Sequence, residues 1–369
     1  MPTTFDLAID CRLRNSTGIG RVIRELVPRI VAALPEQRIL LVGPGPADPW
    51  AGALADGRVE FLPSSAAVFR QGEQRLFREV LPQARVLWCT HFCVPWSVPR
   101  DARLVTTIHD LIPWHVPAGV KGRIRQFGAW FYLRAAQRNS RLVLTGAESV
   151  RGELTREFGF APDRIRMVLL GVAPEWKHAS PGTAPAGTAA GRFVLYVGNL
   201  SPHKNVTGLL AAFDALKAAI PHRLVIVGEP RGFAGHAGFA RLAQRLGDRV
   251  IFARRLTEPE LLGTVAAAEL LVLPSLEEGF GLPPLEAMAA GTPVLTSDCA
   301  TLLETAARGA HRFRLADRDD LGVQLRRLLT DDALRCSKVE EGRAWAGQFT
   351  WERAAEMTAS ALREALEQP

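Results

Sequence analysis

Two glutamates, Glu278 and Glu286, are separated by seven residues in a stretch that combines a glycine-rich loop with a helix start. The apolar run Leu270–Leu273 before them has the length of a buried parallel strand, and Pro283 and Pro284 after the loop suit a first helical turn. Loop amides and a helix N-terminus at the carboxyl edge of a parallel sheet favour phosphate binding. Because a carboxylate repels phosphate, we expect the two glutamates to accept hydrogen bonds from hydroxyl groups of a sugar and a ribose.

Two residues outside this stretch also have the types and positions that chemistry requires. Lys204 lies near the N-terminus of a predicted helix, where a lysine is unfavourable unless an anion is close. His109 follows a predicted strand at its carboxyl side and precedes Asp110, whose carboxylate can brace the loop or orient the ring. The ordinary alternatives stay open at this point. His109 alone could be a hydrogen-bonded structural residue, Glu278 a solvated loop acid and Glu286 a first-turn acid that satisfies the helix dipole.

The elements that must position these residues alternate between short apolar runs and helical segments, which predicts the α/β class with doubly wound parallel sheets. The expected strands are residues 5–10, 38–43, 58–63, 85–89, 103–109 and 141–145 in the first half, and 193–198, 223–228, 250–252, 270–273 and 293–296 in the second. Helices are expected at about 22–34 and 206–219. Residues 180–188 have linker composition. We therefore predict domains at 1–178 and 190–350, followed by a last helix at 351–369.

Composition limits the classes of protein to consider. The chain has 369 residues, of which 47% are hydrophobic and 22% charged, as expected for a soluble globular protein of two domains. It lacks an apolar run long enough to span a membrane, and its start does not resemble a secretory signal. Five scattered cysteines indicate a reducing compartment, so we expect a cytoplasmic protein. The net charge of +7 favours anionic partners, but without a K/R-rich run we expect no nucleic acid.

The run EGFGLPPLEAMAAGTPV, which begins at Glu278, resembles the donor-site signature of retaining glycosyltransferases of family 4. The resemblance extends over nearly the whole chain and implies the GT-B fold, in which two Rossmann-like domains face each other across a cleft. It implies that residues 1–178 bind the acceptor, that residues 190–350 bind a nucleotide-sugar donor, and that helix 351–369 crosses back to the first domain. In the family, the residue matching Glu278 contacts the transferred sugar, and the residue matching Glu286 holds the ribose.

The same resemblance assigns roles to further residues. His109, in a match to the family pattern H-D-x-x-P, would reach the transferred sugar, and Lys204 would bind the donor diphosphate. This chain has Asn199 where the family has an arginine, so His203 or Arg21 is the alternative source of a second positive charge. The remaining donor-site residues implied by the resemblance are Gly18, Gly20, Arg255, Leu256, Gly279, Phe280, Gly281 and Leu282.

The expected reaction is transfer of a hexose, with retention, from a nucleotide sugar to a glycan or lipid-linked acceptor. The motifs most resemble mannosyl- and rhamnosyl-type enzymes of bacterial polysaccharide assembly, which favours mannose from GDP-mannose. No D-x-D pair offers itself to a metal, so we expect neither a metal nor another cofactor. The alternatives are a GT-B sugar-nucleotide epimerase, which would change carbon two without transfer, and a catalytically silent nucleotide-sugar-binding protein.

Two other patterns have an ordinary and a functional interpretation. Residues 89–93, Cys-Thr-His-Phe-Cys, offer too few ligands for structural zinc, and buried cysteines are the better interpretation, although His91 remains a candidate for the acceptor pocket. Trp130, Arg134, Arg138 and Arg141 recur at helical spacing. They form either a solvated face or a peripheral contact with the inner face of a membrane and a lipid-linked acceptor.

Overall fold

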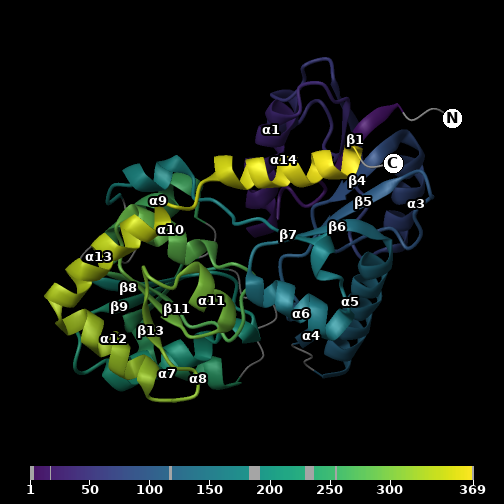
Figure 1. The fold of residues 1–369 in the computed structure, drawn as a ribbon. Helices are drawn as coiled ribbons and strands as arrows, with labels where there is room; N and C mark the ends of the chain where they lie inside the picture. Colours follow the sequence, from purple (N-terminus) through teal and green to yellow (C-terminus); the bar gives the residue numbers. More distant parts are fainter. Residues whose placement is uncertain are drawn as a thin grey trace. The chain divides into compact units, whose positions relative to one another are not determined.

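The computed structural model describes residues 4–16, 18–115, 119–182, 192–228, 237–253 and 256–367. The chain forms two compact units (Figure 1). Unit 1 comprises Met1–Gly171 and Trp351–Pro369, and unit 2 comprises Val172–Thr350. Residues 172–178, which we expected in the first domain, belong to unit 2, where the Val172 N–H donates to the Phe349 carbonyl at 3.1 Å. Residues 183–188 of the predicted linker lie outside the described residues.

Unit 1 is built on a seven-stranded parallel sheet with strand order β3-β2-β1-β4-β5-β6-β7. Its strands are β1 (Phe5–Asp10), β2 (Ile39–Gly43), β3 (Val59–Pro63), β4 (Ala84–Cys89), β5 (Arg103–Thr107), β6 (Ser140–Thr145) and β7 (Ile165–Met167). Its helices are α1 (Gly18–Ala33), α2 (Pro49–Gly52), α3 (Gln71–Val80), α4 (Ile112–His115), α5 (Gly119–Asn139), α6 (Glu148–Phe158) and α14 (Trp351–Glu367). The C-terminal helix α14 packs along α1 (Figure 1).

Unit 2 repeats this architecture with a six-stranded parallel sheet in the order β10-β9-β8-β11-β12-β13. The strands are β8 (Phe193–Val197), β9 (Arg223–Val227), β10 (Val250–Ala253), β11 (Leu270–Leu273), β12 (Val294–Ser297) and β13 (His311–Phe313). The helices are α7 (Val206–Leu216), α8 (Ala237–Leu246), α9 (Glu258–Ala267), α10 (Leu282–Ala290), α11 (Ala300–Thr305), α12 (Asp320–Thr330) and α13 (Asp332–Ala346). Strands β8 and β11 lie side by side at the centre, so the loops that follow them meet at one edge.

The apolar runs found in the sequence all form strands; the central strands are buried, whereas the edge strands β3 and β10 are partly exposed. Strands β7 and β13, of three residues each, were not predicted. Helix α1 begins at Gly18, four residues before the predicted start. Arg141 lies in β6 rather than on α5, so the predicted stripe of Trp130 and arginines ends at Arg138.

Two expectations about the whole chain can be compared with the structure. All five cysteines are free thiols, four of them buried and Cys336 exposed. Within the described residues, no helix combines the length and the apolar character that crossing a membrane requires.

Candidate functional site

The centre of the candidate site in unit 2 is an ion pair between Lys204 and Glu278. Lys204 ends a short 3₁₀ turn after β8, and Glu278 lies in the loop after β11. The Lys204 ammonium donates to Glu278 Oε1 at 2.7 Å and to Oε2 at 2.8 Å. Both side chains are largely removed from water, with 16% of the lysine and 7% of the glutamate side chain exposed. The structure therefore brings together the predicted diphosphate cation and the predicted sugar-binding acid.

The loop that carries Glu278 is held in place by hydroxyl groups. Ser275 Oγ donates to Glu278 Oε1 at 2.6 Å, and Thr301 Oγ1 on α11 donates to the Glu278 carbonyl at 2.8 Å. Thr305, one turn further along α11, donates to the Phe280 carbonyl at 2.5 Å. These three residues were missed by the sequence analysis, because hydroxyl groups in a loop and a short helix carry no signal of their partners. Their bonds fix the carboxylate and the loop backbone before any ligand arrives.

The loops after β8 and β11 are joined directly. The Leu276 N–H donates to the His203 carbonyl at 2.7 Å. Burial and the neighbouring Lys204 ammonium lower the pKa of His203, so its ring is neutral at pH 7. The expectation that His203 could replace the missing family arginine as a second cation is therefore not supported.

Helix α10 starts at this loop in a geometry that only glycine accommodates well. Gly281, its N-cap, has φ +89°, and a Cβ there would lie 2.7 Å from a methyl carbon of Leu302. Pro283 and Pro284 follow in the first turn and have no N–H, so the donors of the helix start are concentrated at Gly281 and Leu282. The N–H groups of Gly281 and Leu282 are therefore the backbone donors that this helix start offers at the predicted phosphate position.

The remaining predicted donor-site residues occupy separate positions in unit 2. Glu286 is 7% exposed and lies in the second turn of α10, so the alternative of a first-turn acid is wrong. Asn199 follows β8, where its carbonyl accepts from the Tyr196 hydroxyl at 2.7 Å. Its side-chain Oδ1 is buried without a hydrogen-bond partner among the described residues. Leu256 is half-buried before α9, and Arg255 lies outside the described residues.

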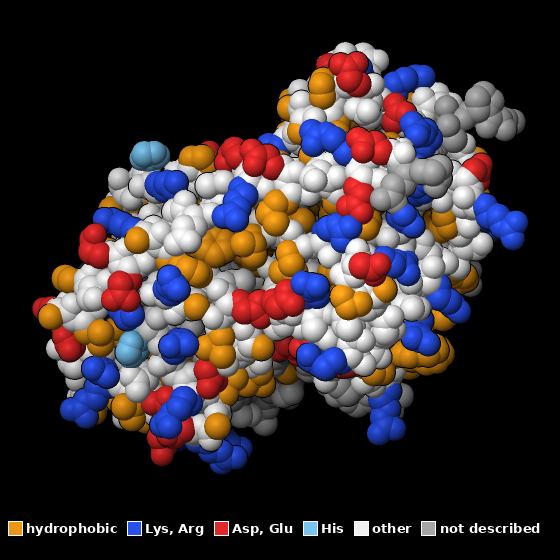
Figure 2. Space-filling view, viewed as in Figure 1, with side chains coloured by type: hydrophobic (Ala, Val, Ile, Leu, Met, Phe, Trp, Pro, Cys, Tyr) orange, Lys and Arg blue, Asp and Glu red, His pale blue; other side chains and the backbone are white. Residues whose placement is uncertain are grey.

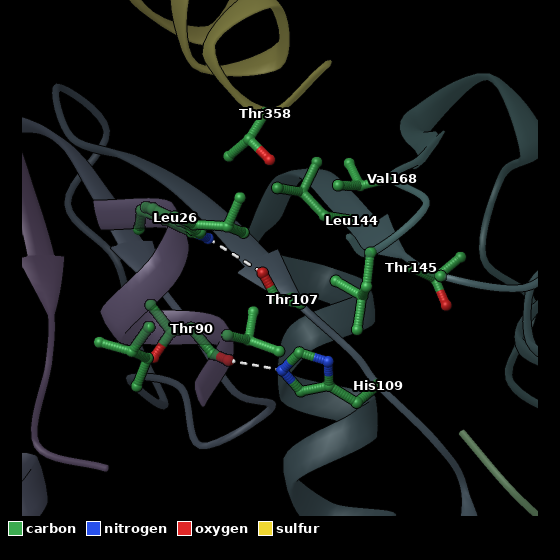
Figure 3. A pocket seen from close by; sticks show the side chains of 13 residues that line it. Leu26, Thr90, Thr107, His109, Leu144, Thr145, Val168 and Thr358 are labelled. Carbon is green, nitrogen blue, oxygen red and sulfur yellow. Dashed lines mark hydrogen bonds between the residues drawn. The ribbon is translucent and has the colours of Figure 1, made fainter. Parts of the chain in front are cut away.

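The predicted catalytic histidine belongs to unit 1. His109 lies two residues after β5 and borders a cavity of about 20 Å³, room for about one water (Figure 3). Its Nε2 lies 3.0 Å from the Thr90 carbonyl, which can only accept, so Nε2 carries the proton and Nδ1 is the acceptor. Burial lowers the pKa of His109 to about 4, although the Thr90 carbonyl favours the protonated ring. A neutral, oriented imidazole results.

The two predicted glycines of unit 1 lie in the first turn of α1 and not in a loop before it. A Cβ on Gly20 would lie 2.5 Å from the Arg14 carbonyl oxygen, so glycine is required for the backbone to pass there. Gly18 has open space around its Cβ position. The backbone of unit 1 therefore requires glycine at position 20, whether or not Gly20 contacts the donor as the family resemblance implies.

A buried charge network at the end of β1 was not predicted. Arg12 donates to Asp10 through Nε at 2.8 Å and Nη2 at 2.6 Å, and Nη2 also donates to Glu73 at 3.0 Å. Glu73 is fully buried, and burial raises the pKa of its carboxyl, opposed by Arg12. Its second oxygen accepts from the Phe69 N–H at 2.7 Å and from the Tyr132 hydroxyl at 3.2 Å. The network thus fixes the loop before α3.

Residues 89–93 contain two buried cysteines, as the sequence indicated. His91 Nδ1 lies 3.2 Å from Cys93 Sγ, but among the described residues Cys89, His91 and Cys93 do not gather their ligand atoms closely enough to share a metal ion. Burial, with smaller effects of His109 and Arg12, lowers the pKa of His91 to about 3. The ring packs edge-on at 5.7 Å against Phe69, which is exposed and has φ +61°. His91 is therefore a neutral member of an aromatic cluster.

One pair does have the D-x-D spacing, Asp317 and Asp319, and the structure shows what engages it. Asp317 pairs with Arg314 at 2.9 Å and accepts from the Asp319 N–H at 3.1 Å. These contacts belong to the turn that leads into α12, which Asp320 supports by accepting from the Arg314 N–H at 2.7 Å. The pair therefore serves a local turn.

The arrangement in unit 2 suits a ligand with a diphosphate next to hydroxyl-bearing rings. An ammonium has three N–H donors, of which two bind Glu278 and one is left for a phosphate oxygen. A carboxylate has about four acceptor positions, so Glu278 can accept from a sugar hydroxyl in addition to Lys204 and Ser275. The site can thus bind a phosphate through Lys204 and a sugar hydroxyl through Glu278, side by side.

Comparisons with known proteins give two family matches that together span most of the chain. Residues 188–345 match the family described as glycosyl transferases group 1, and residues 16–176 match glycosyltransferase family 4. Over 238 residues the chain is 30% identical to the O-antigen chain mannosyltransferase B of Escherichia coli. The aligned residues make up 61% of each protein. The first curated relatives are matched over 53% to 61% of their own lengths.

Solved structures agree with this fold. Sucrose-phosphate synthase from Thermosynechococcus elongatus matches with a TM-score of 0.73 at 21% identity, over 97% of this chain and 98% of that one. Anabaena HepE in complex with UDP-glucose matches with a TM-score of 0.71 at 16% identity, over 98% and 100%. Two parallel sheets flanked by helices, in this order, are the GT-B fold.

Proposed function

The chain belongs to glycosyltransferase family 4, and on this premise we propose that it transfers a hexose, with retention, from a nucleotide sugar to a glycan or lipid-linked acceptor. The observation that carries the proposal is the Lys204–Glu278 pair beside the start of α10. A cation and helix amides suit the diphosphate, and the paired carboxylate suits the sugar.

In this proposal Lys204 binds the diphosphate through its third N–H. As the glycosidic bond to phosphate breaks, negative charge develops on the leaving diphosphate, and the ammonium with the Gly281 and Leu282 amides stabilises it. Glu278 accepts from hydroxyls of the transferred hexose, and Glu286 on α10 accepts from the ribose. Positions fixed by packing and hydrogen bonds, such as that of Glu278, lower the entropic part of the barrier.

The contacts of Glu278 also bear on how configuration is retained. A carboxylate that accepts from an ammonium and a hydroxyl is a weak nucleophile, because its charge is already engaged. We therefore favour attack by the acceptor hydroxyl on the same face that the diphosphate leaves, with the leaving phosphate oxygen taking the hydroxyl proton. The neutral His109 of unit 1 positions the sugar in this scheme.

For the donor we favour GDP-mannose, and the name of the E. coli relative, a mannosyltransferase, supports this choice. The acceptor class, a glycan or a lipid-linked saccharide, and a place at the inner face of the cytoplasmic membrane are parts of the same proposal. No metal or further cofactor is required by it.

The proposal is tested by screening nucleotide sugars for binding and slow hydrolysis. We expect hydrolysis of GDP-mannose, and at least a tenfold lower kcat/KM, about 1.4 kcal/mol, in Lys204→Met and Glu286→Ala. Lys217→Met is the matched control, because Lys217 forms a partly exposed pair with Asp214 at 2.9 Å on the same unit. Wild-type rates in the first two variants would overturn the assignment of the site. Inversion at carbon two without sugar release would instead identify an epimerase, and binding without turnover a silent binding protein.

A further inference from the structure

The solvent face of α5 in unit 1 exposes large apolar side chains. Ile124 and Phe127 are each 68% exposed and Trp130 is 39% exposed, whereas the opposite face of the helix is buried in unit 1. The rings of Phe127 and Trp130 stack with centroids 5.9 Å apart. Three large apolar side chains at spacings of three residues on one helix form a continuous surface and not scattered exposures.

A second element extends this surface. Trp96, 49% exposed, lies edge-on against Phe131 of α5 at 5.3 Å. Asn139 at the end of α5 donates to the Pro95 and Trp96 carbonyls, each at 3.1 Å, and the Trp96 N–H donates to Gln74 at 3.0 Å. The backbone of Pro95 and Trp96, which carries the exposed indole, is thus held by three hydrogen bonds. The surface formed by Trp96, Ile124, Phe127 and Trp130, here called the α5 face, exists before any partner binds.

Along α5 itself the charge has a single sign. From residue 122 to residue 141 the sequence reads GRIRQFGAWFYLRAAQRNSR, with arginines and no acidic residue. Arg123, Arg125 and Arg138 are exposed, and Arg134 donates to the Phe158 carbonyl at 3.1 Å. Figure 2 shows hydrophobic and basic side chains next to one another at the lower right, over the part of unit 1 where Figure 1 places α5.

We propose that the α5 face docks on an anionic phospholipid bilayer. Arg123 lies one helical turn before Phe127 and Arg134 one turn after Trp130, whereas the core of a protein–protein interface is depleted of charge. Aromatic rings at the level of the headgroups, with arginines on the lipid phosphates, match the polarity and charge of a bilayer surface. Because the other face of α5 is buried in unit 1, the contact is made by side chains of a folded domain. This inference deepens the membrane location that is part of the proposed function, and because it is tested without nucleotide sugar it can fail while the transfer reaction stands.

The test is sedimentation of the full chain with vesicles of phosphatidylcholine alone or with added phosphatidylglycerol, in the absence of nucleotide sugar. We expect binding only with phosphatidylglycerol, weakening as salt rises. Each arginine near such a surface contributes about fivefold, so Arg123→Glu with Arg125→Glu should weaken binding by about 25-fold or more. Phe127→Ser with Trp130→Ser should also weaken it, while circular dichroism stays unchanged.

Helix α12 of unit 2 offers matched controls. Arg326 and Arg327 are exposed, so their double change to glutamate alters net charge by the same amount, and Val323→Ser removes an apolar side chain that is 57% exposed. These variants should bind vesicles as the wild type does. The inference is overturned if the wild type ignores phosphatidylglycerol, if the α12 variants lose as much binding as the α5 variants, or if duplex DNA is bound in place of vesicles.

Discussion

Replacing Lys204 by methionine removes the ammonium that neutralises Glu278 and keeps most of the side-chain volume. Glu278 is 7% exposed and would retain only the hydrogen bond from Ser275 at 2.6 Å in place of three. Breaking a buried ion pair by removing one partner costs about 3–5 kcal/mol. Lys204 is 16% exposed, so some water reaches the site, and we expect the free energy of unfolding to fall by about 3 kcal/mol.

A double-mutant cycle isolates the charge from other effects of the substitution. Glu278→Gln keeps the shape of the side chain and its bond from Ser275, and leaves the more exposed ammonium unpaired, so we expect a smaller loss than for Lys204→Met. The double variant has no buried charge. It should therefore be more stable than the sum of the two losses predicts by about 1 kcal/mol or more.

The assay is urea unfolding followed by circular dichroism, with thermal melts as a second measurement. For a unit of this size, about 3 kcal/mol lowers Tm by about 6–12 °C. Lys217→Met, which breaks the partly exposed pair with Asp214, should cost less than about 1 kcal/mol. Two results would refute the reasoning: a Lys204→Met variant within about 0.5 kcal/mol of the wild type, or losses that simply add in the cycle.

The folded state keeps His109 and His91 neutral, with pKa values of about 4 and 3, at pH values where unfolded histidines bind protons. The free energy of unfolding therefore falls as pH drops below about 6.5. His109→Gln should reduce the slope of this free energy against pH, measured by urea titrations, by up to about 1.4 kcal/mol per pH unit. An unchanged slope would contradict this prediction. Arg12→Met leaves Asp10 and Glu73 buried as uncompensated carboxylates and should cost about 3–5 kcal/mol at pH 7, whereas a loss under about 1 kcal/mol would show that the network is not stabilising. Hydrolysis of the nucleotide sugar should survive chelation by EDTA, and a loss that Mg²⁺ or Mn²⁺ restores would require a metal.

The strands were predictable because their signal is local. Short apolar runs such as Leu270–Leu273 must be buried, and the turns and helices that bound them follow from glycine, proline and helix-forming residues within a few positions. Strands β7 and β13 were not predicted, because an apolar pattern of three residues is too short to indicate a strand. The start of α1 was misplaced because Gly18 and Gly20 were interpreted as loop residues. In fact Gly20 allows the helix backbone to pass the Arg14 carbonyl.

The contacts of the candidate site were not predictable in the same way, because they join distant parts of the chain. Lys204 and Glu278 are 74 residues apart, and Arg12 and Glu73 are 61 apart. Sequence pattern identified Lys204 as a residue in local conflict with its helix, but nothing near it named the partner. Glu73 gave no local signal, since one acid in the first turn of a helix is ordinary.

The pairing of Lys204 with Glu278 also resolves a conflict in the sequence argument, which placed an acid beside a phosphate. With the ammonium bound to both carboxylate oxygens, the pair is close to neutral, so an approaching diphosphate meets little net repulsion. Once the diphosphate binds the third N–H, the ammonium lies between two anions, and its pull on Glu278 weakens. Sugar hydroxyls can then replace part of what the carboxylate loses. Donor binding should therefore be cooperative within one molecule. The Glu278→Ala variant should bind UDP or GDP only slightly more weakly than the wild type does, whereas its affinity for the full nucleotide sugar should be lower by about tenfold or more.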